Sequence, residues 1–150
     1  MQRAGSIDVR RRKAFLGLLA MHHIYCPTKR QCIVELAELR ALSGLYLFGK
    51  PGRVVVEGER VAVRDYIESV RAMRWQKCAE MAPLMESAVW LQGQRSQLFP
   101  EQHGFIEVAS EDALSRALSD WGAASVDRAL KRPFGGARIA LTSEAEDTRR

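Results

Sequence analysis

Long apolar runs are missing from this chain of 150 residues, and cysteine is scarce. A helix that spans a membrane needs about 20 consecutive apolar residues, and no stretch of the sequence approaches that length. The three cysteines, Cys26, Cys32 and Cys78, form an odd count without the spacing of a disulfide framework. These absences predict a soluble protein of a reducing, intracellular compartment, with no membrane partner.

Apolar residues nevertheless make up 47% of the chain and charged residues 27%, which is enough for one hydrophobic core. We expect a folded domain over residues 14–132. Residues 1–13 are basic with little to bury, and they are predicted to be a flexible arm. Residues 133–150 are rich in glycine and charge, and they are predicted to be a disordered tail.

Positive charge is concentrated in the first half of the chain. Residues 1–80 contain 15 Lys and Arg against 8 Asp and Glu, a net charge of +7, whereas residues 81–150 contain 8 against 10, a net charge of −2. A basic region of this kind favours an acidic partner such as nucleic acid. Two alternatives stay open: a soluble protein that merely carries a basic leader, and a mitochondrial leader, because Asp8 is the single acid among the first 13 residues.

The pattern of apolar and turn-forming residues predicts alternating strands and helices. Strands are expected over residues 14–25, 45–48, 53–57 and 105–109, with a further one within 76–91. Helices are expected over 28–43 and 59–73, and again from Ser110 to Gly122 and from Ser125 to Arg132. Thr28 is the expected N-cap of the first helix. Lys50-Pro51-Gly52 predicts a type II turn with Gly52 at the position of positive φ.

The predicted fold is therefore α+β: a ferredoxin-like β-α-β-β-α-β sandwich with a C-terminal β-α extension. We expect the four core strands to form one antiparallel sheet. The helices over 28–43 and 59–73 should pack together on one of its faces. The other face of such a sheet is open unless something covers it, and single-stranded RNA commonly lies there in RNA-recognition folds.

One motif resembles a nucleotide-binding loop. Residues 44–50 fit the first seven positions of the phosphate-binding loop, but the eighth must be Ser or Thr to hold magnesium, and here it is Pro51. The interior of the motif, Leu-Tyr-Leu-Phe, favours a strand instead. We therefore expect neither nucleotide binding nor hydrolysis.

Histidine and cysteine residues near the end of the first strand are of the type that binds metal. His22, His23, Cys26 and Cys32 lack a second pair at the spacing of a zinc site, and on a strand His22 and His23 would point to opposite faces. No glycine-rich nucleophile turn and no orienting acid accompany the cysteines. We expect no catalytic residue, no metal, no cofactor and no small-molecule substrate.

Cations near turns and helix ends make a nucleic-acid interface the better-supported interpretation. Cationic side chains hold phosphates, and aromatic faces stack on bases. We expect phosphate contacts from Lys29, Arg30, Lys50, Arg53 and Arg74, together with the arm from Arg10 to Lys13, and base stacking from Tyr46. Core packing is the alternative for Tyr46, and it is the favoured role for Trp75.

An ordered series of short motifs resembles a known family. The motifs are His22-His23-Ile24-Tyr25, Lys29-Arg30, Leu42-Ser43-Gly44, Gly49-Lys50-Pro51-Gly52, Val55-Val56-Glu57-Gly58, and Arg71 with Trp75. The series, over residues 14–132, is similar to the C-terminal domain of the spliceosomal pre-mRNA-processing factor 3. Its motifs are still more similar to the C-terminal domain of RWD domain-containing protein 2.

The resemblance implies a ferredoxin-like fold without catalytic residues, in the nucleus or the cytoplasm. In the splicing factor this domain binds the single-stranded end of a small nuclear RNA, which implies a module for RNA or for ribonucleoprotein proteins in mRNA splicing by the spliceosome. The alternative implied by the RWD proteins is a protein–protein interaction module, an adaptor of the ubiquitin or SUMO pathway.

Overall fold

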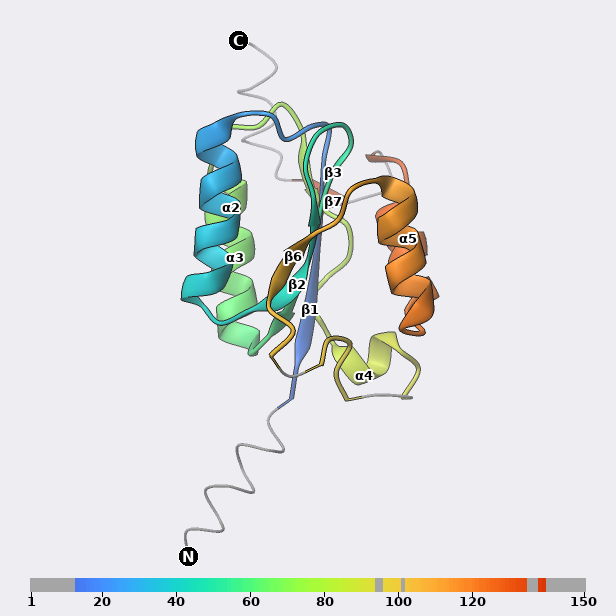
Figure 1. Ribbon diagram of the computed structural model, residues 1–150. Helices are drawn as coiled ribbons and strands as arrows, with labels where there is room; N and C mark the ends of the chain where they lie inside the picture. The colour runs from blue at the N-terminus through green and yellow to red at the C-terminus, as the bar shows by residue number, and fades with distance from the viewer. Residues whose placement is uncertain (1–12, 94–95, 101, 135–137, 140–150) are drawn as a thin grey trace, which may run out of the picture.

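A seven-stranded sheet is the middle layer of the protein (Figure 1). The computed structural model describes residues 13–93, 96–100, 102–134 and 138–139. The strands run in the order β6-β2-β3-β1-β4-β7, and β5 pairs with β1 beside β4. The β2–β6 pair is parallel and the others are antiparallel. The strands are β1 (Phe15–Met21), β2 (Ser43–Leu47), β3 (Gly52–Gly58), β4 (Cys78–Glu80), β5 (Met85–Glu86), β6 (Phe105–Glu107) and β7 (Arg138–Ile139).

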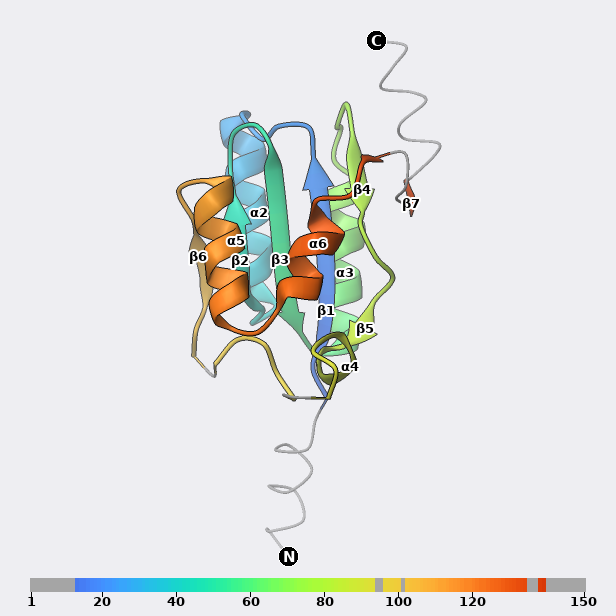
Figure 2. The ribbon, with the colours of Figure 1, turned by 90° about the vertical axis from the view of Figure 1, so that its right-hand side faces the viewer.

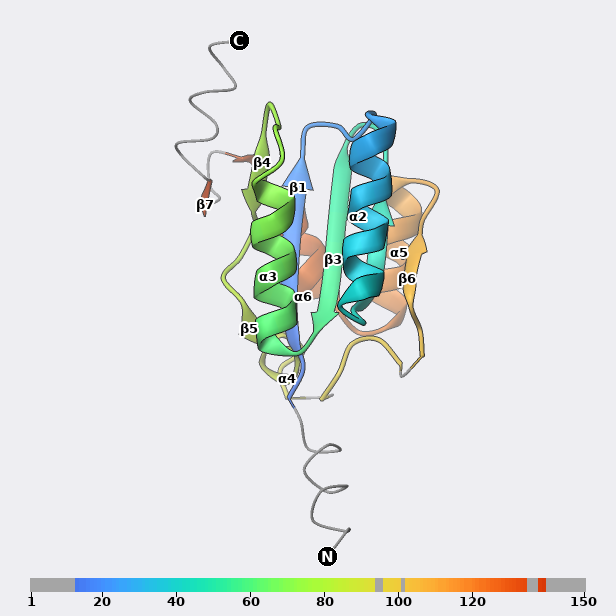
Figure 3. The same ribbon diagram turned by 90° about the vertical axis from the view of Figure 1, so that its left-hand side faces the viewer.

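Helices cover both faces of this sheet. Figure 3 shows α2 (Pro27–Leu39) and α3 (Arg60–Arg71) on one face, and Figure 2 shows α5 (Glu111–Asp120) and α6 (Ala124–Leu130) on the other. The short α4 (Ser87–Trp90) lies below the sheet in Figure 1. The α+β class is confirmed. The prediction that the two helices near 28–43 and 59–73 share one face of an antiparallel four-stranded sheet is also confirmed.

The face under α2 and α3 is held by an apolar stripe on α3. Val63, Tyr66, Ile67 and Val70 fall at helical spacing, and all four are buried. The Tyr66 hydroxyl donates a hydrogen bond of 2.9 Å to the carbonyl oxygen of Ile33 on α2. This contact ties the two helices together and satisfies a polar group that burial would otherwise leave unpaired.

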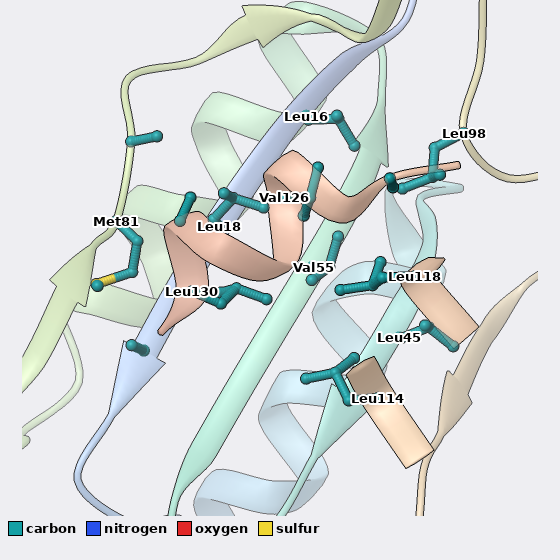
Figure 4. Close-up of a cluster of buried hydrophobic side chains, with 14 of the residues drawn as sticks. Leu16, Leu18, Leu45, Val55, Met81, Leu98, Leu114, Leu118, Val126 and Leu130 are labelled. Carbon is teal, nitrogen blue, oxygen red and sulfur yellow. The ribbon is translucent and has the colours of Figure 1, made fainter. Parts of the chain in front are cut away.

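The opposite face of the sheet is covered by α5 and α6. Leu114 and Leu118 of α5 and Val126 and Leu130 of α6 are buried in one cluster with Val55 and other side chains of the sheet (Figure 4). The sequence left open whether this face is covered, and it is covered because β1 is apolar at nearly every position. Its alternate residues therefore give both faces a hydrophobic surface that must be buried.

Two local predictions are corrected at the first helix and the following hairpin. Helix α2 begins at Pro27, with Cys26 rather than Thr28 at the N-cap, because proline suits the first helical position. The Lys50–Pro51 peptide is cis, and the positive φ lies at Gly49 (93°) rather than at Gly52. Gly52 instead opens β3 opposite Met21, so the turn is not of type II.

The segment after α3 also differs from its prediction. One strand was expected within residues 76–91, and the structure has β4, β5 and α4 there. β7 lies within the predicted tail and pairs with β4. Most of that tail, and the arm before Lys13, lie outside the described residues. No helix in the described ranges is long and apolar enough to cross a membrane.

Candidate functional site

Three loops and the start of α2 meet at one end of the sheet, the upper end in Figure 3. They are the β1–α2 loop (residues 22–26), the β2–β3 hairpin (48–51) and the α3–β4 loop (72–77). Ile24 and Gly49 join the first two loops through paired backbone hydrogen bonds of 2.8 and 3.1 Å. Because all these segments end at the same edge, residues far apart in sequence share one surface, which we call the basic end.

The five predicted phosphate-binding cations lie on this basic end. Lys50 is exposed on the hairpin and Arg74 is exposed on the α3–β4 loop, whereas Lys29, Arg30 and Arg53 are half-buried. Within the described part of the chain, no salt bridge joins any of the five to a carboxylate. The topology therefore brings these five cations together, whereas Lys13, also expected to contact phosphate, lies near the start of β1 at the opposite end of the sheet, with its Nζ 3.0 Å from Glu86 Oε2.

Arg30 and Arg53 are partly committed to contacts within the fold. The Arg30 Nε donates 3.0 Å to the Ile24 carbonyl, and its guanidinium lies 4.8 Å from the centre of the Phe48 ring. An Arg53 Nη1 donates to the carbonyls of Gly52 (2.8 Å) and Met21 (3.3 Å). Burial lowers the pKa of Arg53, while the charge of Glu111 acts in the opposite direction. Both side chains therefore stabilise the loops of the basic end through contacts within the fold.

Lys29 is held in place by an aromatic ring. Its Nζ lies 4.4 Å from the centre of the Trp75 ring, within the range of a cation–π contact. Trp75 is only 6% exposed and donates its indole N–H to the Val70 carbonyl at 2.7 Å. The core role favoured for Trp75 is confirmed, and the ring also fixes the position of a surface ammonium group.

Tyr46 does not belong to this surface. Its side chain is 8% exposed and packs between Phe48 and Phe105, with ring centres 4.8 and 4.5 Å away. Burial raises the pKa of its phenol. The prediction that Tyr46 stacks on a base is therefore wrong. Its ring lies in the core beneath α2 and α3, because this side chain of β2 faces the helices.

A pocket of about 60 Å³ opens between the β1–α2 and α3–β4 loops. Its walls include His22, His23, Tyr25, Lys29, Trp75 and Lys77, together with Cys26 and Gln76. His22 and His23 were expected to point to opposite faces, but β1 ends at Met21, so both line this pocket with ring centres 5.5 Å apart. No cluster of three or more His, Cys, Asp or Glu side chains suited to a metal ion occurs among the residues that the structure describes.

The electrostatics of the pocket favour an anion. Burial lowers the pKa of His22, and the positive charges of His23, Lys50 and Lys77 lower it further. The N–H groups of Lys29 and Thr28 at the start of α2 lower the pKa of the Cys26 thiol. None of the described residues lining the pocket is acidic. A phosphate group would relieve the repulsion among these cations.

A different polar cluster occupies the opposite end of the sheet. The carboxylate of Glu57, at the end of β3, is 3% exposed and accepts hydrogen bonds from the backbone N–H of Leu98 (2.6 Å) and Phe99 (2.8 Å). It also accepts one from the hydroxyl of Ser87, which is fully buried. This carboxylate pins the 96–100 loop under the sheet, where Leu98 and Phe99 are buried.

Sequence reasoning missed the pocket and the role of Glu57. The sequence carried a signal for the pocket, because His22, His23 and Tyr25 come shortly before Pro27, and a proline can begin a helix and so end the preceding strand. The predicted strand over residues 14–25 includes all three residues, so the sequence analysis did not predict that they share a pocket. Arg71, which belongs to the series of family-like motifs, forms an ion pair: its Nη1 lies 3.4 Å from Glu80 Oε1.

Comparison with known proteins finds a similar solved structure and a matching family. The crystal structure of acylphosphatase from Bacillus subtilis superposes with a TM-score of 0.44 at 15% identity, covering 63% of this chain and 98% of that one. The family described as small nuclear ribonucleoprotein Prp3, C-terminal domain, matches residues 18–129. The resemblance to RWD domain-containing protein 2 stays a prediction. Since the family match covers well over half of the chain and agrees with the motifs, this protein belongs to the family of the Prp3 C-terminal domain.

Proposed function

We propose that this protein is a non-catalytic RNA-binding module of a splicing ribonucleoprotein and that the basic end is its RNA-binding surface. The observation that carries the proposal is the convergence of Lys29, Lys50, Arg74 and Lys77 from three separate segments, α2, the β2–β3 hairpin and the α3–β4 loop, onto one edge. Such a group of cations repels itself unless an anion neutralises it. The proposed role needs no cofactor and has a nuclear location.

The family supports the same conclusion. A small nuclear ribonucleoprotein assembles on RNA, and the matched residues 18–129 include every cation of the basic end. The β-α-β-β-α-β order and the strand order β2-β3-β1-β4 support a ferredoxin-like assignment for the core. With both sheet faces covered by helices, RNA would bind at the edge formed by the loops and not across the sheet.

Salt-dependent binding to a short single-stranded RNA tests this proposal. If about four phosphates are neutralised, log affinity should fall against log salt with a slope near −3. Replacing Lys50 and Arg74 together by alanine should weaken binding and flatten that slope by roughly one to two. Filter binding at several salt concentrations measures both quantities.

A matched control separates a defined surface from general basicity. Arg64→Ala with Arg116→Ala removes the same charge from exposed positions on α3 and α5. We expect this control to lose much less affinity than the pair at the basic end. Equal losses in the two double variants, or an affinity that does not depend on salt, would contradict the proposal.

One observation favours a second candidate, a protein–protein interaction module. β6 is an edge strand of the sheet, and its Ile106 is 44% exposed. Edge strands pair readily with an added strand of another chain. If RNA binding fails the tests above while Ile106→Lys abolishes capture of a protein component of the splicing ribonucleoprotein, this second function is the better description.

A further inference from the structure

The basic end carries an exposed aromatic ring that none of the predicted RNA contacts includes. Tyr25 is 54% exposed, and it is the one aromatic side chain among the large exposed hydrophobics of the described residues. Its ring stacks on His23, with ring centres 4.6 Å apart and an angle of 28° between the planes. A tyrosine ring that is braced on one side and open to water is suited to stacking on a further flat group.

The pocket beside this ring has the size and charge of a phosphate site. Tyr25 itself lines the pocket, together with Lys29 and Lys77. A volume of about 60 Å³ holds a group of a few heavy atoms, roughly the space of four water molecules. Lys29 is fixed over Trp75 and Lys77 lies 5.8 Å from the centre of the Phe134 ring, so neither ammonium group is wholly unrestrained.

We propose that Tyr25 and the adjoining pocket form a site for one nucleotide of single-stranded RNA, with the base stacked on Tyr25 and its phosphate held between Lys29 and Lys77. This inference rests on the proposed function and adds the nucleotide contacts to it. Because Tyr25 forms part of the pocket wall, a base on its open face brings the phosphate of the same nucleotide to the pocket. Stacking requires a base that is not paired in a duplex, so the site selects single strands.

Affinity for a fluorescein-labelled single-stranded octamer, measured by fluorescence anisotropy, tests the stacking contact. Tyr25→Ala should weaken binding about 5- to 150-fold without changing the salt slope, because stacking involves no phosphate. Tyr25→Phe keeps the ring and should stay within about twofold of the wild type. Leu39→Ala, at an exposed position at the far end of α2, is the matched control and should bind normally.

The pocket is tested separately by two readouts. Lys29→Ala with Lys77→Ala should weaken binding and flatten the salt slope by about one. Cys26 lines the pocket and is exposed with a lowered thiol pKa, so iodoacetamide should modify it readily, whereas Cys78 is buried with its pKa raised to about 12. Bound octamer should slow the alkylation of Cys26 at least severalfold, as measured by mass spectrometry.

The outcomes separate this inference from the proposed function. If Tyr25→Ala binds like the wild type, or if bound RNA leaves Cys26 alkylation unchanged, while the Lys50 and Arg74 pair still lowers affinity, the nucleotide site is overturned and the RNA-binding surface stands. Equal affinity for the octamer and for a duplex of the same charge would also overturn it. If the wild type binds no RNA, both proposals fail.

Discussion

Arg53 and Glu57 are four residues apart on β3, yet the surroundings of charged groups differ at the two ends of this strand. At the Arg53 end, the cations Lys50, Lys29 and Arg74 are exposed or half-buried without a salt bridge among the described residues. At the Glu57 end, one carboxylate is buried and accepts three hydrogen bonds. A buried carboxylate that accepts three hydrogen bonds stabilises a fold, whereas several cations that lie together in water favour binding of an anionic ligand.

The largest expected effect is the loss of stability in Glu57→Gln. The carboxamide presents an N–H₂ group where a second oxygen accepted a bond, so at least one buried N–H of Leu98 or Phe99 loses its partner. We expect the free energy of unfolding to fall by about 3 kcal/mol, measured by urea denaturation. Glu68→Gln, exposed on α3, is the control and should change it by less than about 0.5 kcal/mol. Similar changes in unfolding free energy for the two variants would contradict the claim that the buried carboxylate of Glu57 stabilises its end of the sheet.

The next effect concerns the packing that holds the basic end together. A Cβ at Gly52 would overlap the side chain of Ile24, which is fully buried. Gly52→Val should therefore cost about 1–3 kcal/mol in unfolding free energy and weaken RNA binding by displacing the β1–α2 loop. Gly49→Ala has open space but a φ of 93°, and it should cost about 1 kcal/mol. A larger loss of unfolding free energy in Gly49→Ala than in Gly52→Val would mean that backbone conformation, and not the contact with Ile24, dominates the stability of the basic end.

A smaller effect is expected from pH. In the unliganded protein, burial and the charges of His23, Lys50 and Lys77 hold the pKa of His22 below its usual 6.5. Phosphate in the pocket favours the protonated ring and raises that pKa, so binding takes up a proton. RNA affinity should rise by less than tenfold for each pH unit as pH falls through about 6.5. His22→Gln should lack this rise, and a rise shared by both proteins would assign it to other groups.

The stability of the unliganded protein should change with pH in the other direction. A His22 pKa that is lower in the folded state than in the unfolded state means that the unfolded chain binds more protons below about pH 6.5. His22 therefore contributes stability that is lost as pH falls. His103, whose pKa burial lowers as well, acts with the same sign. Urea denaturation at pH 7.5 and pH 5.5, compared between the wild type and His22→Gln, separates the two histidines.

The smallest expected effect concerns the stability contributed by the exposed cations of the basic end. Lys50→Ala with Arg74→Ala removes two exposed cations that make no salt bridge within the described part of the chain. We expect the free energy of unfolding to change by less than about 0.5 kcal/mol for each substitution. A loss of several kcal/mol would show that these cations are structural, as Glu57 is, and would weaken their assignment to RNA.

Much of the basic end could be predicted from local sequence. Lys50 lies at a proline-glycine turn and Arg74 follows a helix whose apolar stripe is clear, so both were expected at exposed loop positions. Local sequence did not predict that Tyr46 is buried and Tyr25 exposed, because a strand pattern does not indicate which side of the strand faces a helix. Tyr46 faces α2 and α3 and is buried, whereas Tyr25 lies beyond the end of β1 and is exposed.

The α+β class, the first two long helices and their shared face could be predicted from the sequence, since hydrophobic periodicity and turn residues act over a few positions. Three features emerged from the folded structure alone: α5 and α6 cover the second face, Glu57 binds a loop some 40 residues away, and one pocket is lined by His22, Tyr25, Lys29 and Lys77. These features depend on contacts between segments distant in the chain. Their energies depend on burial and distance, which local patterns do not contain.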